Sequence, residues 1–111
     1  MSMYLVQFTL TPATWARMLE KPEDRRAALA PLYAALGGKL HGFWYASSGA
    51  GDGYVLGELP DDVAAARAFA MVNSSGAFTS ISATKLLSVE EMLQALRGAA
   101  DLEYRAPGTA S

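Results

Sequence analysis

Alternation of apolar and polar residues predicts four β-strands in this chain. In residues 3–9, Tyr4, Val6 and Phe8 fall on one face and Gln7 and Thr9 on the other, with the period of two that marks a half-buried strand. The four predicted strands cover residues 3–9, 39–45, 52–59 and 80–87. Residues 46–51 are rich in serine and glycine, so strands two and three are expected to form a hairpin with a loose turn.

Helix start and stop signals separate these strands. Thr11-Pro12 is an N-cap followed by proline at the first helical position, and Pro22 should end that short helix. A second helical run begins near Glu23 and ends at Gly37-Gly38. Pro31 lies inside it and is expected to kink it. One apolar stripe supports the run: Leu29, Leu32, Tyr33 and Leu36.

Two further helices follow in the second half of the chain. Pro60-Asp61-Asp62 supplies carboxylates that can cap a helix, which should run to about Val72 and break at residues 73–76. Ser88-Val89-Glu90-Glu91 has the spacing of a capping box and should start the last helix.

The resulting order is strand, helix, strand, strand, helix, strand, with an additional C-terminal helix. This order predicts an α+β protein of the ferredoxin-like βαββαβ class with an antiparallel sheet. Helices would cover one face of that sheet, and two sheets packed face to face in a homodimer would cover the other. We expect one domain over residues 1–104 and a disordered tail over residues 105–111.

Composition narrows the function classes. The chain has 111 residues, 51% hydrophobic and 18% charged, with a net charge of −2, no cysteine and one histidine. Absence of cysteine excludes disulfides, thiolate metal sites and cysteine nucleophiles, and a single histidine makes a metal site or a bound cofactor a poor prediction. Nine scattered basic residues argue against nucleic-acid binding. No run of apolar residues is long enough to span a membrane, and a cytoplasmic location is expected.

Several short motifs resemble the GYD domain family. They are Gly37-Gly38-Lys39-Leu40, Gly42-Phe43-Trp44-Tyr45, Gly49-Ala50-Gly51-Asp52 and Glu58-Leu59-Pro60-Asp61-Asp62. Gly49 and Asp52 match the first and last positions of the family's hairpin signature, whereas Gly51 stands where the family has tyrosine. The resemblance covers about residues 3–92 and implies a fold of the dimeric α/β-barrel type, a homodimer or higher homo-oligomer, and no established activity.

Strand parity suggests a candidate site on the sheet face away from the helices. If the hairpin pairs Tyr45 with Tyr54, then His41 lies opposite Glu58 on that face. A carboxylate beside an imidazole orients it and favours general-base chemistry, and Tyr45 or Tyr54 could stabilise an oxyanion. The predicted catalytic residues are therefore His41, Glu58 and Tyr45. The predicted ligand-binding residues are Gln7, Thr9, Phe43, Asp52, Tyr54 and Thr84.

Each of these residues also has a structural explanation. A lone histidine is more often solvent-facing or structural than catalytic, and Asp52 is suited to capping the hairpin turn through bonds within the turn. Three functions remain open. One is a homodimeric module that binds or senses a small apolar or aromatic molecule in a pocket on the sheet face. The others are a cofactor-independent oxygenase or isomerase with His41 as base, and a protein-interaction module.

Overall fold

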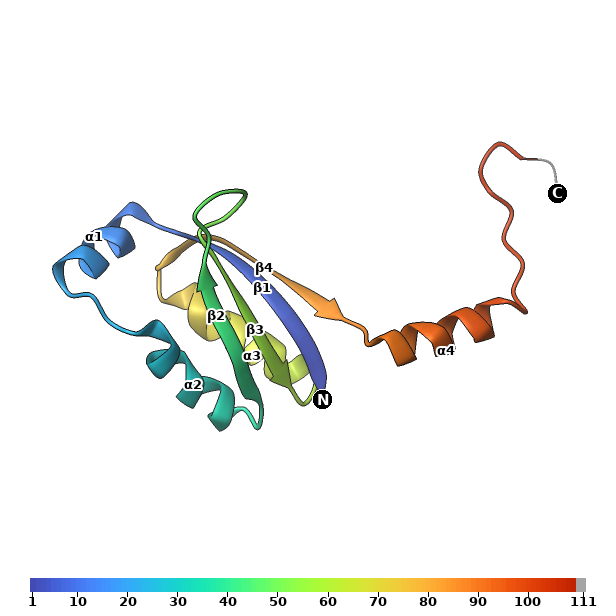
Figure 1. Ribbon diagram of the computed structural model, residues 1–111, viewed down its shortest axis with the longest axis horizontal. Helices are drawn as coiled ribbons and strands as arrows, with labels where there is room; N and C mark the ends of the chain where they lie inside the picture. Colours follow the sequence, from blue (N-terminus) through green and yellow to red (C-terminus); the bar gives the residue numbers. More distant parts are fainter. Residues whose placement is uncertain (110–111) are drawn as a thin grey trace.

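The computed structural model describes residues 1–109, within which the chain forms four strands and four helices (Figure 1). In chain order the elements are β1 (Ser2–Leu10), α1 (Pro12–Glu20), α2 (Arg25–Ala35), β2 (Lys39–Tyr45), β3 (Gly53–Leu59), α3 (Asp62–Ser74), β4 (Phe78–Leu86) and α4 (Val89–Ala99). All four predicted strands are present, with boundaries that differ by at most two residues. Of the predicted tail, residues 105–109 form neither helix nor strand, and residues 110–111 lie outside the described part.

The strands form one antiparallel sheet in the order β2-β3-β1-β4. The sequence-adjacent pair β2 and β3 forms the predicted hairpin, and β1 is inserted between β3 and β4. This arrangement is an α+β fold compatible with the ferredoxin-like class.

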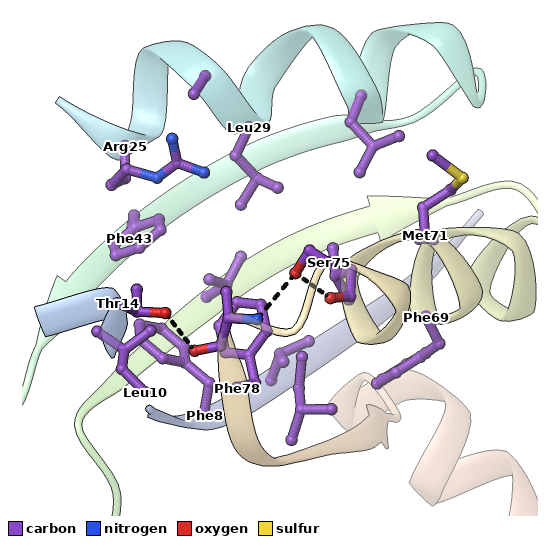
Figure 2. Close-up of a pocket in the computed structure, with 18 of the residues that line it drawn as sticks. Phe8, Leu10, Thr14, Arg25, Leu29, Phe43, Phe69, Met71, Ser75 and Phe78 are labelled. Carbon is purple, nitrogen blue, oxygen red and sulfur yellow. Dashed lines mark hydrogen bonds between the residues drawn. The ribbon is translucent and has the colours of Figure 1, made fainter. Parts of the chain in front are cut away.

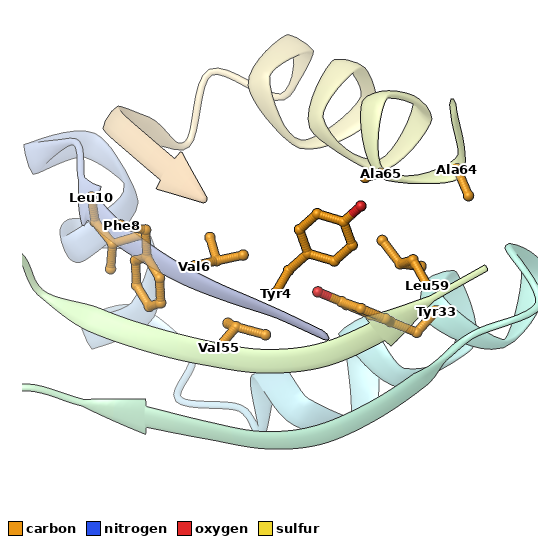
Figure 3. Packing of buried hydrophobic residues seen from close by; sticks show 9 residues of the cluster. All are labelled: Tyr4, Val6, Phe8, Leu10, Tyr33, Val55, Leu59, Ala64 and Ala65. Carbon is orange, nitrogen blue, oxygen red and sulfur yellow. The ribbon is translucent and has the colours of Figure 1, made fainter. Parts of the chain in front are cut away.

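The helix-covered face of the sheet holds the hydrophobic core (Figure 3). Every second residue of β1 is buried on this face, beginning with Tyr4 and ending with Leu10, and the buried residues of β3 alternate in the same way. Helix α2 packs against β2 and β3, whereas α3 packs against β3 and β4. The buried residues of β1 and β3 therefore form one apolar surface, and α2 and α3 pack against it.

Side-chain caps fix the starts of the helices. Thr11, Asp24, Asp61 and Ser88 each accept a backbone N–H in the first helical turn, and Ser88 and Glu91 form the predicted capping box. Helix α2 begins at Arg25, two residues later than expected, because Asp24 is its cap, and it continues through Pro31.

A polar cluster ties the start of α3 to the sheet. The Tyr4 hydroxyl donates a 2.6 Å hydrogen bond to Asp62 Oδ1, and Lys85 Nζ lies 3.0 Å from the same oxygen. The pKa of the Asp62 carboxyl is lowered, first by the Tyr4 hydrogen bond and then by Lys85, while the pKa of the Tyr4 phenol is raised by the same hydrogen bond. Residues from β1, β4 and α3 are thereby joined at one point.

One face of the sheet stays uncovered. In the part of the chain that the structure describes, no element lies over the second face of the sheet, which we call the open face. Helix α4 does not cover it, because it continues away from the end of β4 (Figure 1). The molecule is accordingly elongated, with extents of 62 × 33 × 24 Å.

Candidate functional site

A cavity of about 720 Å³ lies on the helix-covered face of the sheet, between the helices and the strands (Figure 2). Its walls come from β1, β2, β3 and β4 and from α1, α2 and α3. The lining combines aliphatic side chains with seven aromatic ones, which are Tyr4, Phe8, Tyr33, Phe43, Tyr45, Phe69 and Phe78. Helices α2 and α3 both pack on this face of the sheet, and the cavity is bounded by both of them and by the strands.

Phe8 is the centre of the aromatic lining at one end of the cavity. Its ring makes edge-on contacts with Phe43 at 5.5 Å and with Phe78 at 5.6 Å between ring centroids. Phe43 in turn lies 5.2 Å from Tyr45. Such offset and edge-on pairs are stable arrangements of aromatic rings, so this wall presents ring edges and faces to a bound molecule.

Tyr33 brings a polar atom into this apolar lining. The residue is only 6% exposed, yet its hydroxyl has no hydrogen-bond partner among residues 1–109. Figure 3 shows the ring beside Tyr4, with the hydroxyl pointing towards the centre of the core. Burial raises the pKa of the Tyr33 phenol above its usual value of 10.0. The phenol is therefore neutral at physiological pH and can donate or accept a hydrogen bond.

Gly57 makes room for Tyr33. A Cβ atom at Gly57 would collide with the ring and hydroxyl of Tyr33, which lie directly on the β3 backbone. Gly53 makes room for Phe8 on the same face in the same way, because a Cβ at Gly53 would collide with the ring of Phe8. Glycine inside a strand often marks such a close approach.

The rim of the cavity is polar and mixed in charge. Arg25 Nη1 lies 2.7 Å from Glu23 Oε1, and Arg17 Nη2 donates a 3.2 Å hydrogen bond to Thr14 Oγ1. Tyr45 also lies at the rim, and burial is the main reason that the pKa of its phenol is raised. Charged groups thus surround the entrance while the interior stays apolar.

His41 and Glu58 form the predicted pair, but by a different route from the one expected. His41 Nε2 lies 2.6 Å from Glu58 Oε1, with both side chains more than two-thirds buried. The expected pairing of Tyr45 with Tyr54 is wrong, because Tyr45 pairs with Gly53 and Trp44 pairs with Tyr54. A register shift between Leu40 and Gly42 leaves His41 as the extra residue of a bulge, which directs it towards Glu58.

The same register overturns the expected orientation of Phe43 and Tyr45. Both were expected beside His41, but Phe43 pairs with Val55, which is buried on the helix-covered face, and Tyr45 follows two residues later on that face. They contact Phe8 and line the cavity. Tyr45 is therefore separated by the sheet from His41 and Glu58, and the three predicted catalytic residues do not form one site.

The remaining predicted ligand-binding residues of the strands lie on the open face, as expected from strand parity. Gln7 pairs with Tyr54 on one side and Ser82 on the other, and Thr84 pairs with Leu5. Thr9 falls on the same face by alternation, since Phe8 and Leu10 are buried on the other. These residues form a band across the sheet rather than the lining of the cavity. The Tyr54 hydroxyl donates to the carbonyl oxygen of Ala50 at 3.1 Å.

Asp52 joins the hairpin to β1 instead of capping the turn from within. Its Oδ2 accepts a 2.8 Å hydrogen bond from the backbone N–H of Leu10, and its own N–H donates to the carbonyl of Phe8 at 2.7 Å. The pairing of β1 with β4 shifts register at Thr9 and Leu10, and Asp52 supplies an acceptor there. Asp52 therefore has a structural role, because it connects the hairpin to the end of β1.

Gly51 replaces the tyrosine of the family signature next to Asp52. It has a positive φ of 79°, which glycine adopts without strain, and a Cβ here would press against the side chain of Gln7. A side chain at this position would therefore have to displace Gln7 at the edge of the open face.

Sequence reasoning missed Tyr33 and Gly57 as site residues. Tyr33 belongs to the apolar stripe of its helix and was interpreted there as a core residue, which its burial supports. Glycine within the third predicted strand was the available signal, because it marks a place where another group approaches the backbone.

The fold and this hollow, aromatic-lined sheet face define an α+β domain with a ligand-sized interior space. The chain belongs to the GYD domain family, whose model matches residues 4–96. Neither the curated proteins nor the solved structures contain a match to this chain. Among residues 1–109, no group of three or more potential metal-ligating side chains comes together, and no helix has the length and hydrophobicity needed to cross a membrane.

Proposed function

We propose that this protein binds a small, largely apolar aromatic molecule in the cavity between the sheet and the helices. The supporting observation is an aromatic-lined space of about 720 Å³, into which Tyr33 brings a hydroxyl that is not sealed off from the cavity and has no hydrogen-bond partner among residues 1–109. Ligand sites are commonly apolar pockets of roughly 300–1,000 Å³ with a few polar groups that fix the orientation of the ligand. In this proposal Tyr33 is the orienting group, and the aromatic wall around Phe8 and Phe43 holds the body of the ligand.

Catalysis is the second candidate, and the His41–Glu58 contact favours it. A histidine 2.6 Å from a carboxylate has the arrangement of an oriented general base. It lies on the open face, however, and Tyr45 is on the other side of the sheet. Tyr54 already donates its hydroxyl proton to Ala50. The pair therefore lacks the expected oxyanion donors within its own chain, and ligand binding in the cavity is the stronger proposal.

We also propose that the open face pairs with the open face of a second copy, giving the homodimer expected for a dimeric α/β-barrel fold. Apolar Leu5 and Leu56 pair with each other at the centre of this face, and Trp44 lies over Gly42 beside them. Polar Gln7 and Thr84 lie next to them, so the face mixes apolar and hydrogen-bonding groups in the manner of a protein interface.

The binding proposal is tested with 2-naphthol and naphthalene as probes. We expect both to raise the thermal unfolding temperature through binding to the native state. The matched variants are Ala68→Leu, which puts three more carbons into the cavity lining, and Ala95→Leu, the same change on an exposed position of α4.

Ala68→Leu should reduce the thermal shift produced by both probes because it narrows the cavity, while Ala95→Leu should leave it unchanged. Far-ultraviolet circular dichroism confirms that each variant is folded. If neither probe shifts the unfolding temperature of the unmodified protein, or if Ala68→Leu binds both probes normally, the proposal is wrong.

A further inference from the structure

Helix α4 carries an apolar stripe that the rest of the chain leaves exposed. Val89, Met92, Leu93 and Leu96 follow the i, i+3, i+4, i+7 spacing of one helix face. Their exposures range from 44% to 72%, and none of the side chains of α4 is buried. An amphipathic helix is normally stabilised by burying such a face against another element.

The body of the same chain does not provide that element. Figure 1 shows α4 continuing beyond the end of β4 and away from the other helices. Its start is nevertheless well defined, because the capping box of Ser88 and Glu91 satisfies the first backbone N–H groups. The helix is thus formed and capped at a distance from the core.

The charges of α4 argue against a lipid surface as its partner. Two glutamates and one arginine give residues 89–99 a net negative charge, whereas helices that bind anionic membranes carry lysine and arginine along their polar face. A protein surface with matching charge is the better complement.

We propose that α4 packs antiparallel against α4 of a second copy of this chain. Glu90 and Arg97 are seven residues apart, which is almost two full turns, so both lie on the same flank of the apolar stripe. A two-fold axis perpendicular to the helices brings equal flanks together and reverses their direction. Glu90 of each copy therefore lies opposite Arg97 of the other, and the two ion pairs flank the joined apolar stripes.

This pairing places Leu93 next to the two-fold axis. The midpoint between residues 90 and 97 falls between residues 93 and 94, and only Leu93 of these two belongs to the stripe. Packed helix axes are roughly 8–10 Å apart. The Cα atoms of a helix lie about 2.3 Å from its axis. Two Cα atoms that face each other across the contact, one from Leu93 of each copy, are therefore about 5 Å apart, a separation that a disulfide can bridge.

The contact is separate from the open face of the sheet. The open-face proposal and this one each use their own two-fold axis, and two such contacts on one chain build a tetramer or a longer array. The α4 contact therefore stands or fails independently of sheet-to-sheet pairing.

Single-cysteine variants of the full chain test the proposal, since the natural sequence has no cysteine. We expect Leu93→Cys to form a covalent dimer under mild oxidation at micromolar concentration. Gln94→Cys, which lies on the opposite side of the helix, is the matched control and should stay monomeric on a non-reducing gel. Equal cross-linking of the two variants, or none in Leu93→Cys, would overturn the proposal.

A second pair of variants keeps the test independent of oxidation. Leu93→Glu combined with Leu96→Glu should raise the dissociation constant of the α4 contact at least tenfold, measured by sedimentation. Both positions are exposed, so the fold should persist, and Gln94→Glu combined with Gly98→Glu, both outside the apolar stripe, controls for the two added charges. An unchanged assembly state, or a loss of thermal stability without any change in mass, shows that α4 does not pair in this way.

Discussion

Replacing Tyr33 by phenylalanine removes one hydroxyl and leaves the ring in place. The ring lies against Gly57 and the residue is 6% exposed, whereas the hydroxyl has no hydrogen-bond partner among residues 1–109. An unpaired polar group costs about 1–3 kcal/mol when it is fully desolvated, and the Tyr33 hydroxyl bears only part of this cost because it is not sealed off from the cavity. Removal of this hydroxyl should therefore leave the free energy of unfolding unchanged or raise it by up to about 1 kcal/mol.

The same substitution should have the opposite effect on a ligand that can form a hydrogen bond. A hydrogen bond contributes about 0.5–1.5 kcal/mol, which corresponds to roughly a 2- to 12-fold change in affinity. We expect Tyr33→Phe to weaken 2-naphthol binding by this factor. Naphthalene, which has no hydroxyl, should bind the variant and the natural protein equally well.

Urea unfolding measures the stability change, and isothermal titration calorimetry measures the two affinities. Two protein forms and two ligands make a complete double-mutant cycle, so the coupling between the two hydroxyls is obtained directly. A stability loss of 1 kcal/mol or more would show that the hydroxyl already has a partner in the free protein. Equal weakening of both ligands would show that Tyr33 acts through packing alone.

Three further substitutions test other contacts, each by urea unfolding. Asp52→Ala should lower the free energy of unfolding by about 1–3 kcal/mol because it leaves the Leu10 N–H without its acceptor. Asp52→Asn keeps an oxygen and should lower it less, so equal losses in the two variants would contradict this explanation. The Tyr4 hydrogen bond lowers the pKa of Asp62 below 3.8, so its stabilisation is complete above that pH and is lost as the pH falls towards the lowered pKa; Asp62→Asn should flatten this acid dependence. His41→Ala should lower the free energy of unfolding by less than about 1 kcal/mol and should leave 2-naphthol binding unchanged. A loss of binding would show that the ligand binds on the open face.

Much of the fold was predictable because its signals are local. Caps, prolines and paired glycines mark the helix ends, and alternation in β1 assigns its two faces correctly. The faces of β2 could not be assigned in this way. A bulge adds one residue at His41 and inverts the orientation of every residue after it, and no residue type at that point requires a bulge.

The site was harder to predict because it depends on where the helices leave space. Phe43 and Tyr45 were expected on the open face beside His41, whereas both line the cavity on the helix-covered face. Tyr33 comes from α2, and it lines the cavity because of how α2 and α3 are placed over the sheet. Helix periodicity shows that a residue faces the sheet and gives no information about how far apart two helices lie.

Intermolecular nuclear Overhauser effects from bound 2-naphthol test the binding proposal most directly. The proposal predicts contacts from the naphthol protons to the rings of Tyr33 and Phe43, which line the cavity. Trp44 pairs with Tyr54 on the open face and provides the contrasting signal. Contacts to the Trp44 indole without contacts to Tyr33 would place the ligand outside the cavity and contradict the proposal.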